Sequence, residues 1–339
     1  RQHPWWQWRR SARKRTHLAE LRGDHRSGMR AHAFYQYTFF SQWELVKRAA
    51  NACGIQMVGD IPLYVAEDSA DFWSESSVFQ VDAKHRPTLV AGVPPDAFSP
   101  TGQRWGNPVY DWRYARETEF AWWVRRIRAN LRMYDRLRID HFRGLESYWA
   151  VDAKKKTAEV GEWLPAPGHE LLHALHAALG DLPLIAEDLG DISGGVIALR
   201  NAFNIPGMKI MQYAFENDGT NSYLPHHHRN NFVVYTGTHD NDTLAAWRDH
   251  LDEASMKRVV TYVGEEARTS VWPMLRATWA SVADMAIVPM QDVLGLGAEA
   301  RMNLPGTTDN NWNWRFSADA LGEDLIKRLR ELTAICGRL

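Results

Sequence analysis

The sequence predicts an α/β barrel built from parallel strands, and three observations favour this fold class. Short apolar runs of strand length alternate along the chain with longer segments that carry apolar residues at helical spacing. Three of the short runs end in an acidic residue, and ligand sites in parallel sheets lie at the carboxyl ends of the strands. No run is followed by a G-x-G-x-x-G or P-loop motif, so a barrel is favoured over an open nucleotide-binding sheet.

The strands and helices of this barrel can be placed from their apolar patterns. The expected strands are residues 55–60, 136–140, 183–187, 208–215, 232–236 and 286–289. The expected helices are residues 34–52, 120–134, 170–179, 192–201 and several between about 243 and 281. We expect a single catalytic barrel domain over 1–339, with inserted loop regions at about 61–112 and 150–168.

The expected strands are too few to close the barrel. A closed barrel of this type has eight strands, and an unclosed one leaves two exposed edges. The chain also begins with Arg1 rather than Met. We therefore expect the first strands to be missing from this chain, and we expect the chain to have little activity in isolation.

Composition and charge exclude several classes of partner. The chain has 45% hydrophobic and 24% charged residues, which is typical of a globular protein, and its formal net charge is −1. Such a charge produces no overall field that attracts nucleic acid or an anionic membrane. No apolar run approaches the roughly 20 residues that cross a bilayer. We expect no nucleic-acid or membrane partner and a monomer, with the arginines between 9 and 15 on a solvated helix face.

Cysteine and histidine usage argues against a metal site. The two cysteines, Cys53 and Cys336, lie far apart without C-x-x-C spacing, which argues against a disulfide scaffold and zinc and suits a reducing cytoplasm. Three consecutive histidines at 226–228 lie in a polar segment without a second cluster at ligand spacing. We expect an ordinary surface loop there, no metal, no cofactor and a cytoplasmic location.

Aromatic residues are abundant, with 16 Trp and 12% aromatics overall. Flat amphipathic rings suit the faces of sugars, although core packing is the commoner role of an individual Trp. The segment 34–43 is densely aromatic, and we expect it to pack a helix against the barrel.

The acidic residues at the three strand ends are Asp140, Glu187 and Asp240. Glycoside transfer needs such a set, because one carboxylate attacks the anomeric carbon and a protonated one delivers a proton to the leaving oxygen. Arg138 lies two residues before Asp140 on the same strand face and favours its ionised form, which suits a nucleophile. Glu187 follows an apolar run that would raise its pKa, which suits a general acid. A third carboxylate, Asp240, beside His239, can hold sugar hydroxyls.

Six motifs make the chain resemble the 4-α-glucanotransferases (amylomaltases or disproportionating enzymes), which form glycoside hydrolase family 77 of the α-amylase clan. They occur in family order and cover nearly the whole chain from Phe34 onward. The matching stretches are GDIPLYVAEDSADFW (59–73), GVPPDAFSPTGQRWGNPVYDW (92–112), RIDHFRGLESYWAV (138–151), LIAEDLG (184–190), YTGTHDND (235–242) and ARMNLPGTTDNNWNWRF (300–316).

This resemblance implies roles for residues that match the motifs. It implies Asp140 as nucleophile, Glu187 as acid/base and Asp240 as the third carboxylate. It further implies substrate-binding residues at the cleft, which are Arg138, His239, Asp60, Trp105 and Asn303. The segment 94–107 resembles a loop that arches over the bound glucan. Many relatives have Tyr after the PPD of this loop, where this chain has Ala97 followed by Phe98. We expect Phe98 to contact substrate, and we expect the loss of one aromatic clamp to affect acceptor or chain-length preference but not the chemistry.

The reaction that the resemblance implies is retaining transfer of an α-1,4-glucan segment to a 4-hydroxyl of an acceptor by double displacement. The implied partners are α-1,4-glucans and maltooligosaccharides, with glucose as an acceptor. Two alternatives stay open, namely an α-amylase-type hydrolase with the same carboxylates and a catalytically silent glucan-binding fragment.

Overall fold

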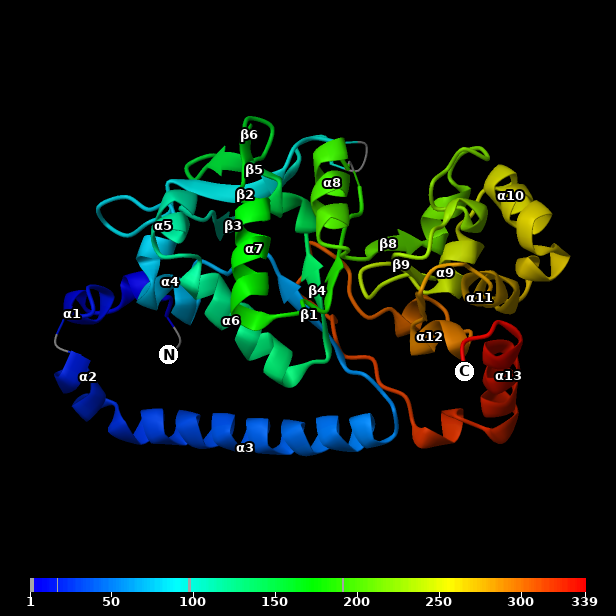
Figure 1. The fold of residues 1–339 in the computed structure, drawn as a ribbon, viewed down its shortest axis with the longest axis horizontal. Helices are drawn as coiled ribbons and strands as arrows, with labels where there is room; N and C mark the ends of the chain where they lie inside the picture. Colours follow the sequence, from blue (N-terminus) through cyan, green and yellow to red (C-terminus); the bar gives the residue numbers. More distant parts are fainter. Residues whose placement is uncertain (1–2, 17, 97–98, 191) are drawn as a thin grey trace. The chain divides into compact units, whose positions relative to one another are not determined.

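The computed structural model describes residues 3–16, 18–96, 99–190 and 192–339, and it divides the chain into two compact units. Unit 1 spans Arg1–Ile205 and unit 2 spans Pro206–Leu339. Figure 1 shows the elements of both units. The single barrel domain over 1–339 stays a prediction.

A three-stranded parallel sheet, of order β1-β4-β7, forms the centre of unit 1. Its strands are β1 Val58–Pro62, β4 Arg136–Asp140 and β7 Leu184–Ala186. They match three of the expected strands, although the first begins at Val58 rather than at residue 55. Gly59 on β1 leaves room for the ring of Tyr134, because a Cβ there would lie 2.2 Å from the ring carbon Cδ2. All three strands point the same way, so their carboxyl ends meet at one edge.

Helices of unit 1 precede, separate and follow these strands. They are α1 Arg10–Arg13, α2 Leu18–Asp24, α3 Arg26–Ala52, α4 Ala70–Ser74, α5 Trp112–Glu117, α6 Ala121–Met133, α7 Gly168–Leu179 and α8 Gly194–Ala202. Helix α6 contacts β1, β4 and α7, so it covers one face of the sheet. Short 3-10 helices lie at Trp5–Gln7, Ser76–Val78 and Phe142–Leu145.

The two inserted regions of unit 1 form an antiparallel sheet of their own, of order β3-β2-β5-β6 (Figure 1). Its strands are β2 Leu89–Val93, β3 Gln103–Pro108, β5 Ser147–Asp152 and β6 Glu162–Pro165. The sequence patterns predicted no strand in these regions. Gly, Pro and polar residues interrupt the alternation there, and the pairing of β2 with β5, which joins the two regions, links residues that lie far apart in sequence.

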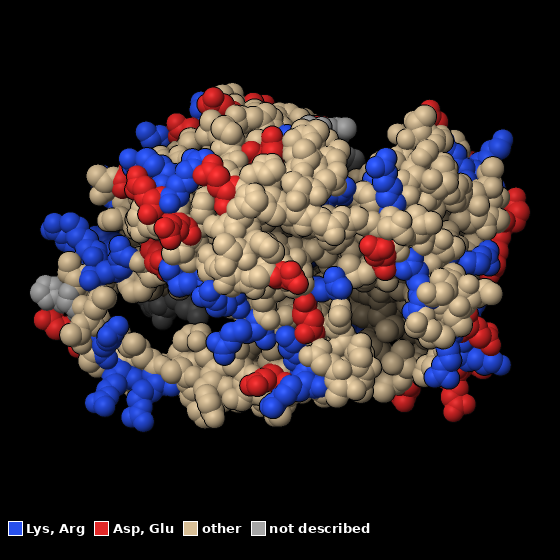
Figure 2. Space-filling view, viewed as in Figure 1, with Lys and Arg blue, Asp and Glu red and all other residues tan. Residues whose placement is uncertain are grey.

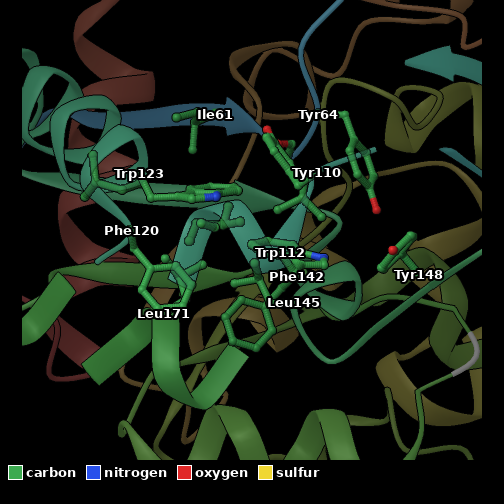
Figure 3. Packing of buried hydrophobic residues seen from close by; sticks show 14 of the residues in the cluster. Ile61, Tyr64, Tyr110, Trp112, Phe120, Trp123, Phe142, Leu145, Tyr148 and Leu171 are labelled. Carbon is green, nitrogen blue, oxygen red and sulfur yellow. The ribbon is translucent and has the colours of Figure 1, made fainter. Parts of the chain in front are cut away.

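An aromatic cluster around Tyr110 forms part of the core of unit 1 (Figure 3). The Tyr110 ring lies within 4.8 to 5.8 Å of the rings of Tyr64, Phe79, Trp112, Trp122 and Trp123. The Tyr110 hydroxyl donates to the carbonyl of Leu63 at 2.6 Å, so the buried oxygen is satisfied. The Trp residues of this cluster are therefore core residues, which agrees with the expectation that core packing is the commoner role of an individual Trp.

A second three-stranded parallel sheet, of order β10-β9-β8, forms the centre of unit 2. Its strands are β8 Gly207–Ile210, β9 Phe232–Tyr235 and β10 Met285–Ile287. Helices surround it, namely α9 Leu244–Asp249, α10 Glu253–Val263, α11 Trp272–Trp279, α12 Met290–Val293 and α13 Glu323–Ile335. Further 3-10 helices lie at Met211–Phe215, Pro225–His227, Glu265–Arg268, Ala298–Ala300 and Ala318–Ala320.

The expected strand over 208–215 is wrong in its second half. Strand β8 ends at Ile210, and Met211–Phe215 is a 3-10 helix. The segment buries Met211, Gln212, Ala214 and Phe215, so consecutive residues are buried without the alternation of a half-buried strand. A short, continuously apolar run cannot be assigned to strand or helix from its pattern alone.

The aromatic segment of α3 is also corrected by the structure. Phe34, Tyr35, Tyr37, Phe39 and Phe40 are exposed large side chains, whereas the expectation was that this segment packs against the barrel. Later turns of the helix do contact other parts of unit 1. There the Trp43 Nε1–H donates to the carbonyl of Met133 at 2.8 Å, and Lys47 Nζ lies 3.1 Å from Asp135 Oδ1.

Charged side chains of both signs intermix on the face drawn in Figure 2, in agreement with the net charge of −1. Basic side chains gather most densely over α1 and the start of α3. Helix α1 buries none of its residues, as expected for the arginine-rich segment. Among the helices that the structure describes, none is both long and apolar enough to cross a membrane.

Candidate active site

The first group of expected site residues surrounds Arg138 of β4 in unit 1. Residues Asp60 and Arg138 are paired in the β1–β4 register, so their side chains lie side by side. The guanidinium donates through Nη1 to Asp60 Oδ2 and through Nη2 to Asp140 Oδ1, the second bond measuring 3.1 Å. Burial lowers the pKa of Arg138, but the charges of Asp60, Asp140 and Glu187 more than offset this and raise it. Arg138 is thus a fixed cation among three carboxyl groups.

Glu187 directly follows the buried strand β7 and lies at the same sheet edge. Its Oε2 accepts a hydrogen bond from the His141 N–H at 2.7 Å, and its Oε1 accepts one from the Leu189 N–H at 3.0 Å. Burial first and the charge of Asp140 second raise the pKa of Glu187 to about 7, against the lowering effects of Arg138 and the two N–H groups. This carboxyl group can therefore hold or release a proton near neutral pH.

His141 contributes to this group, although it was not among the site residues predicted from the sequence. Its φ is 56°, in the left-handed region that side-chain-bearing residues adopt rarely, and such strain concentrates at functional sites. In this backbone conformation, the His141 N–H donates a hydrogen bond to the Glu187 carboxyl group. Burial first and the charge of Arg143 second lower the pKa of His141 to about 4, so the ring is neutral at pH 7. The signal was available, because His141 follows Asp140 within the motif RIDHFRG.

Trp105 of β3 lies against this group. Its ring packs edge-on against the His141 ring with centroids 4.7 Å apart, and the Tyr64 ring lies 6.4 Å away. The indole is 38% exposed, so part of an apolar face stays available beside the strand ends. Phe98 and Ala97, the other positions singled out in this loop, lie outside the described residues.

A buried ion pair anchors the turn that carries Glu187. Arg200 of α8 donates through Nη1 to Asp188 Oδ2 at 2.8 Å, and both side chains are only 7% exposed. Asp188 immediately follows Glu187 and precedes Leu189, whose N–H bonds to the glutamate. The pair therefore fixes the backbone turn that aims these groups.

The second group of expected residues lies in unit 2, after strand β9. Asn303 donates through Nδ2 to Asp240 Oδ1 at 2.7 Å, and His239 Nε2 lies 3.4 Å from Asp240 Oδ2. The Thr238 N–H and hydroxyl both donate to Asn241 Oδ1, at 2.8 and 3.0 Å, which closes the turn around them. The Asp240 side chain is 42% exposed, so it keeps access to solvent.

Arg301 holds the backbone of this second group and was not predicted as a site residue from the sequence. It donates through Nη2 to the Asp240 carbonyl at 2.8 Å and through Nε to the Asn303 carbonyl at 2.9 Å. Its Nη1 also lies 3.4 Å from Asp242 Oδ2. Arg301 stands in the motif ARMNLPG, two residues before Asn303, and that spacing was the available signal.

The histidines at 226–228 have separate environments. His226 and His227 are exposed, as a surface loop predicts, whereas His228 is buried, so the expectation is wrong for this residue. His228 forms hydrogen bonds with Ser281 Oγ at 2.7 Å and the Tyr223 carbonyl at 2.9 Å. Burial is the main cause that lowers its pKa to about 4. Within the described residues, no group of three or more His, Cys, Asp and Glu side chains could hold a metal ion.

The structure therefore brings the expected site residues together in two groups, one in each unit. Unit 1 joins Asp60, Arg138, Asp140 and Glu187, with Trp105 nearby through His141. Unit 2 joins His239, Asp240 and Asn303. A protonatable carboxyl group beside a carboxylate bonded to a guanidinium can perform acid–base and nucleophilic chemistry. The fold and this arrangement match the class of protein that the sequence predicted, an α/β enzyme with carboxyl groups at the ends of its parallel strands.

Comparison with known proteins assigns the family within this class. The family model described as 4-alpha-glucanotransferase matches residues 1–320. The 4-alpha-glucanotransferase of Synechocystis sp. is 48% identical over 98% of this chain and 67% of its own length, and that of Thermus thermophilus is 43% identical over 99% and 69%. The chain belongs to the 4-α-glucanotransferase family, whose members are hexosyl-transferring enzymes.

Solved structures confirm the fold class. Amylomaltase from Streptococcus agalactiae in complex with acarbose superposes with a TM-score of 0.94 at 38% identity, over 99% of this chain and 69% of that chain. Amylomaltase from Corynebacterium glutamicum shares the fold with a TM-score of 0.71 at 20% identity. The α/β barrel fold of amylomaltases is thus the fold of this chain, which spans about two-thirds of the length of the curated relatives named above.

Proposed function

We propose that the full-length protein transfers a segment of an α-1,4-glucan from a donor to the 4-hydroxyl of an acceptor glucan or of glucose. The substrates are α-1,4-glucans and maltooligosaccharides, and the reaction uses no cofactor. The observation that carries the proposal is the pairing of Glu187, whose pKa is raised to about 7, with Asp140, which accepts a hydrogen bond from Arg138. Family membership supports the same reaction.

In the first step, the Asp140 carboxylate attacks the anomeric carbon of the donor and forms a glycosyl ester. The bond from that carbon to the leaving oxygen breaks, and Glu187 gives its proton to the oxygen. In the second step, Glu187 takes the proton of the acceptor 4-hydroxyl, whose oxygen attacks the same carbon and releases Asp140. Two displacements at one carbon retain its configuration.

The other site residues bind sugar in this proposal. Asp240, assisted by His239 and Asn303, binds hydroxyl groups through an exposed carboxylate whose orientation is fixed by the hydrogen bond from Asn303. Asp60 and Arg138 bind at the strand ends of unit 1, and Trp105 offers the exposed part of its ring to a sugar face. Phe98 is proposed as a further substrate contact, from the resemblance of its loop alone. We further propose a cytoplasmic monomer.

Incubation of the full-length protein with maltotriose tests the reaction. Transfer produces glucose and longer maltooligosaccharides while the number of reducing ends stays constant. A net rise in reducing ends would instead establish an α-amylase-type hydrolase. A chain with no rate above that of an Asp140→Asn variant would be a glucan-binding protein without catalysis.

A further inference from the structure

Asp292 is a buried carboxyl group of unit 2 that the proposed reaction does not use. It lies on α12, and only 1% of its surface is exposed. Placing a carboxylate in the interior costs free energy unless hydrogen bonds or charges offset the loss of water. The groups that Asp292 contacts should therefore indicate what its position serves.

The two oxygens of Asp292 contact the two ends of one loop. Thr236, directly after β9, donates from its hydroxyl to Asp292 Oδ2 at 2.5 Å. Leu244, the first residue of α9, donates from its backbone N–H to Asp292 Oδ1 at 2.7 Å. The loop between these two points, residues 237–243, carries His239 and Asp240. One carboxyl group thus closes the loop at its base.

The middle of the same loop is held by other residues. Gln212 donates through Nε2 to the Asp242 carbonyl at 2.9 Å, and Arg301 donates to the Asp240 carbonyl at 2.8 Å. A Cβ on Gly237 would lie 2.7 Å from Gln212 Nε2, so the loop backbone lies directly on that amide. Asp292 is distinguished from these residues because it fixes where the loop leaves the strand and where it enters the helix.

Stability alone explains this carboxyl group poorly. Burial first, together with the charge of Asp242, raises the pKa of Asp292 to about 6, although the hydrogen bonds from Leu244 and Thr236 lower it. A carboxyl group whose pKa is higher in the folded than in the unfolded chain destabilises the fold once it is ionised, which at pH 7 it is. A neutral side chain that accepted the same bonds would avoid this cost.

We propose that Asp292 is a positioning residue, which clamps both ends of loop 237–243 and so holds His239 and Asp240 in the orientation that binds sugar. This inference rests on the proposed function, in which Asp240 contacts the substrate. Since a displacement of about 1 Å at a catalytic site can cost on the order of 100-fold in rate, loosening the clamp should lower kcat strongly.

Three variants of the full-length protein test the clamp. Asp292→Ala removes both acceptors, and Thr236→Val removes only the contact at the end of β9. Asp292→Asn keeps an oxygen for the Leu244 N–H, while its amide can donate to the Thr236 hydroxyl. Asp249→Ala is the matched control, because Asp249 is an exposed carboxylate on α9, the helix that begins at Leu244. The measurements are kcat and KM on maltotriose and hydrogen exchange of peptides that cover residues 237–244.

We expect Asp292→Ala to lower kcat by about 100-fold and to speed exchange in this loop, with Thr236→Val causing a smaller change in the same direction. Asp292→Asn should restore most of the lost rate, and Asp249→Ala should match the wild type. The proposal is overturned if Asp292→Ala keeps the wild-type kcat. It is also overturned if loop exchange is unchanged in both Asp292→Ala and Thr236→Val. If Asp292→Ala does not fold, the kcat and loop exchange of Thr236→Val decide the question by the same criteria.

The same experiment separates this proposal from the proposed function. A wild-type protein that shows no transfer from maltotriose would refute the proposed function. The exchange of loop 237–243 would still report whether Asp292 anchors it, because that measurement needs no substrate.

Discussion

The two groups of site residues differ in what their arginines bind. In unit 1, Arg138 binds the side chains of Asp60 and Asp140, so a buried cation lies between two carboxyl groups. In unit 2, Arg301 binds the backbone carbonyls of Asp240 and Asn303, so it sets the shape of the chain. We infer that unit 1 supplies the groups whose charge changes during the reaction, whereas unit 2 supplies groups that are only held in place.

The largest expected effect comes from Asp140 in unit 1. Asp140→Asn removes the proposed nucleophile and should lower kcat by at least about 10⁴-fold, the scale found when a single covalent catalytic residue is removed. It also removes the charge that helps to raise the pKa of Glu187, so that pKa should fall below about 7. Steady-state rates and NMR titration of the labelled glutamate measure the two effects. A variant with a tenth of the wild-type kcat would disprove the role of Asp140.

Glu187 should show a smaller loss with a distinctive pH signature. The proposed acid must be protonated for the first step, so wild-type kcat/KM should fall above about pH 7, tenfold per pH unit, as the proton is lost. Glu187→Gln should lower the rate by about 10² to 10⁴-fold and abolish that decline. Rates on maltotriose between pH 5 and 9 provide the check. A decline that persists in the variant would assign the titration to another group.

The two arginines allow a matched comparison between the units. Because the charge of Arg138 lowers the pKa of Glu187, Arg138→Gln, which removes that charge, should move the alkaline decline to higher pH, along with a loss of about 100-fold in kcat. Arg301→Gln should lower the rate by about tenfold and leave the pH profile in place, because Arg301 binds backbone carbonyls. A shift of the pH profile in the Arg301 variant would contradict the inference that unit 1 alone supplies the groups whose charge changes during the reaction.

The smallest effect concerns stability rather than rate. The pKa of buried His228 is lowered from 6.5 to about 4, so the neutral ring stabilises the fold above pH 6.5, and this contribution is lost as the pH falls towards 4. Between pH 7 and pH 5 the loss should be about 2 kcal/mol. Denaturant unfolding of His228→Gln should show a weaker pH dependence than the wild type. The exposed neighbour supplies the control, because His227→Gln should keep the wild-type dependence.

Sequence patterns predicted most of the parallel strands and the residues that lie at their carboxyl ends. Apolar runs with an acidic end identify a buried strand well, as β4 shows by matching residues 136–140 without change. The antiparallel strand β2 was not predicted, because it pairs with β5, which is distant in the chain, and its register with β3 is interrupted between Val90 and Gly92. Local periodicity contains no information about such partners.

The candidate site was predictable in its charged side chains but not in its backbone contacts. Asp60, Arg138, Asp140 and Glu187 were named from strand ends and motifs, and the structure groups them. The bond from the His141 N–H to Glu187 depends on a left-handed φ, which no residue pattern specifies for histidine. Arg301 was missed for a related reason, because its partners are carbonyl groups that every residue has.

The position of Arg138 among three carboxyl groups has a consequence for inhibitor recognition. When Glu187 is protonated, the guanidinium faces two carboxylates, and above about pH 7 it faces three. A sugar mimic with an ammonium group in place of the anomeric carbon should gain attraction from this added negative charge. Its affinity should therefore rise with pH through about 7 and fall again once the amine itself loses its proton, which makes basic sugar mimics strongest in mildly alkaline solution.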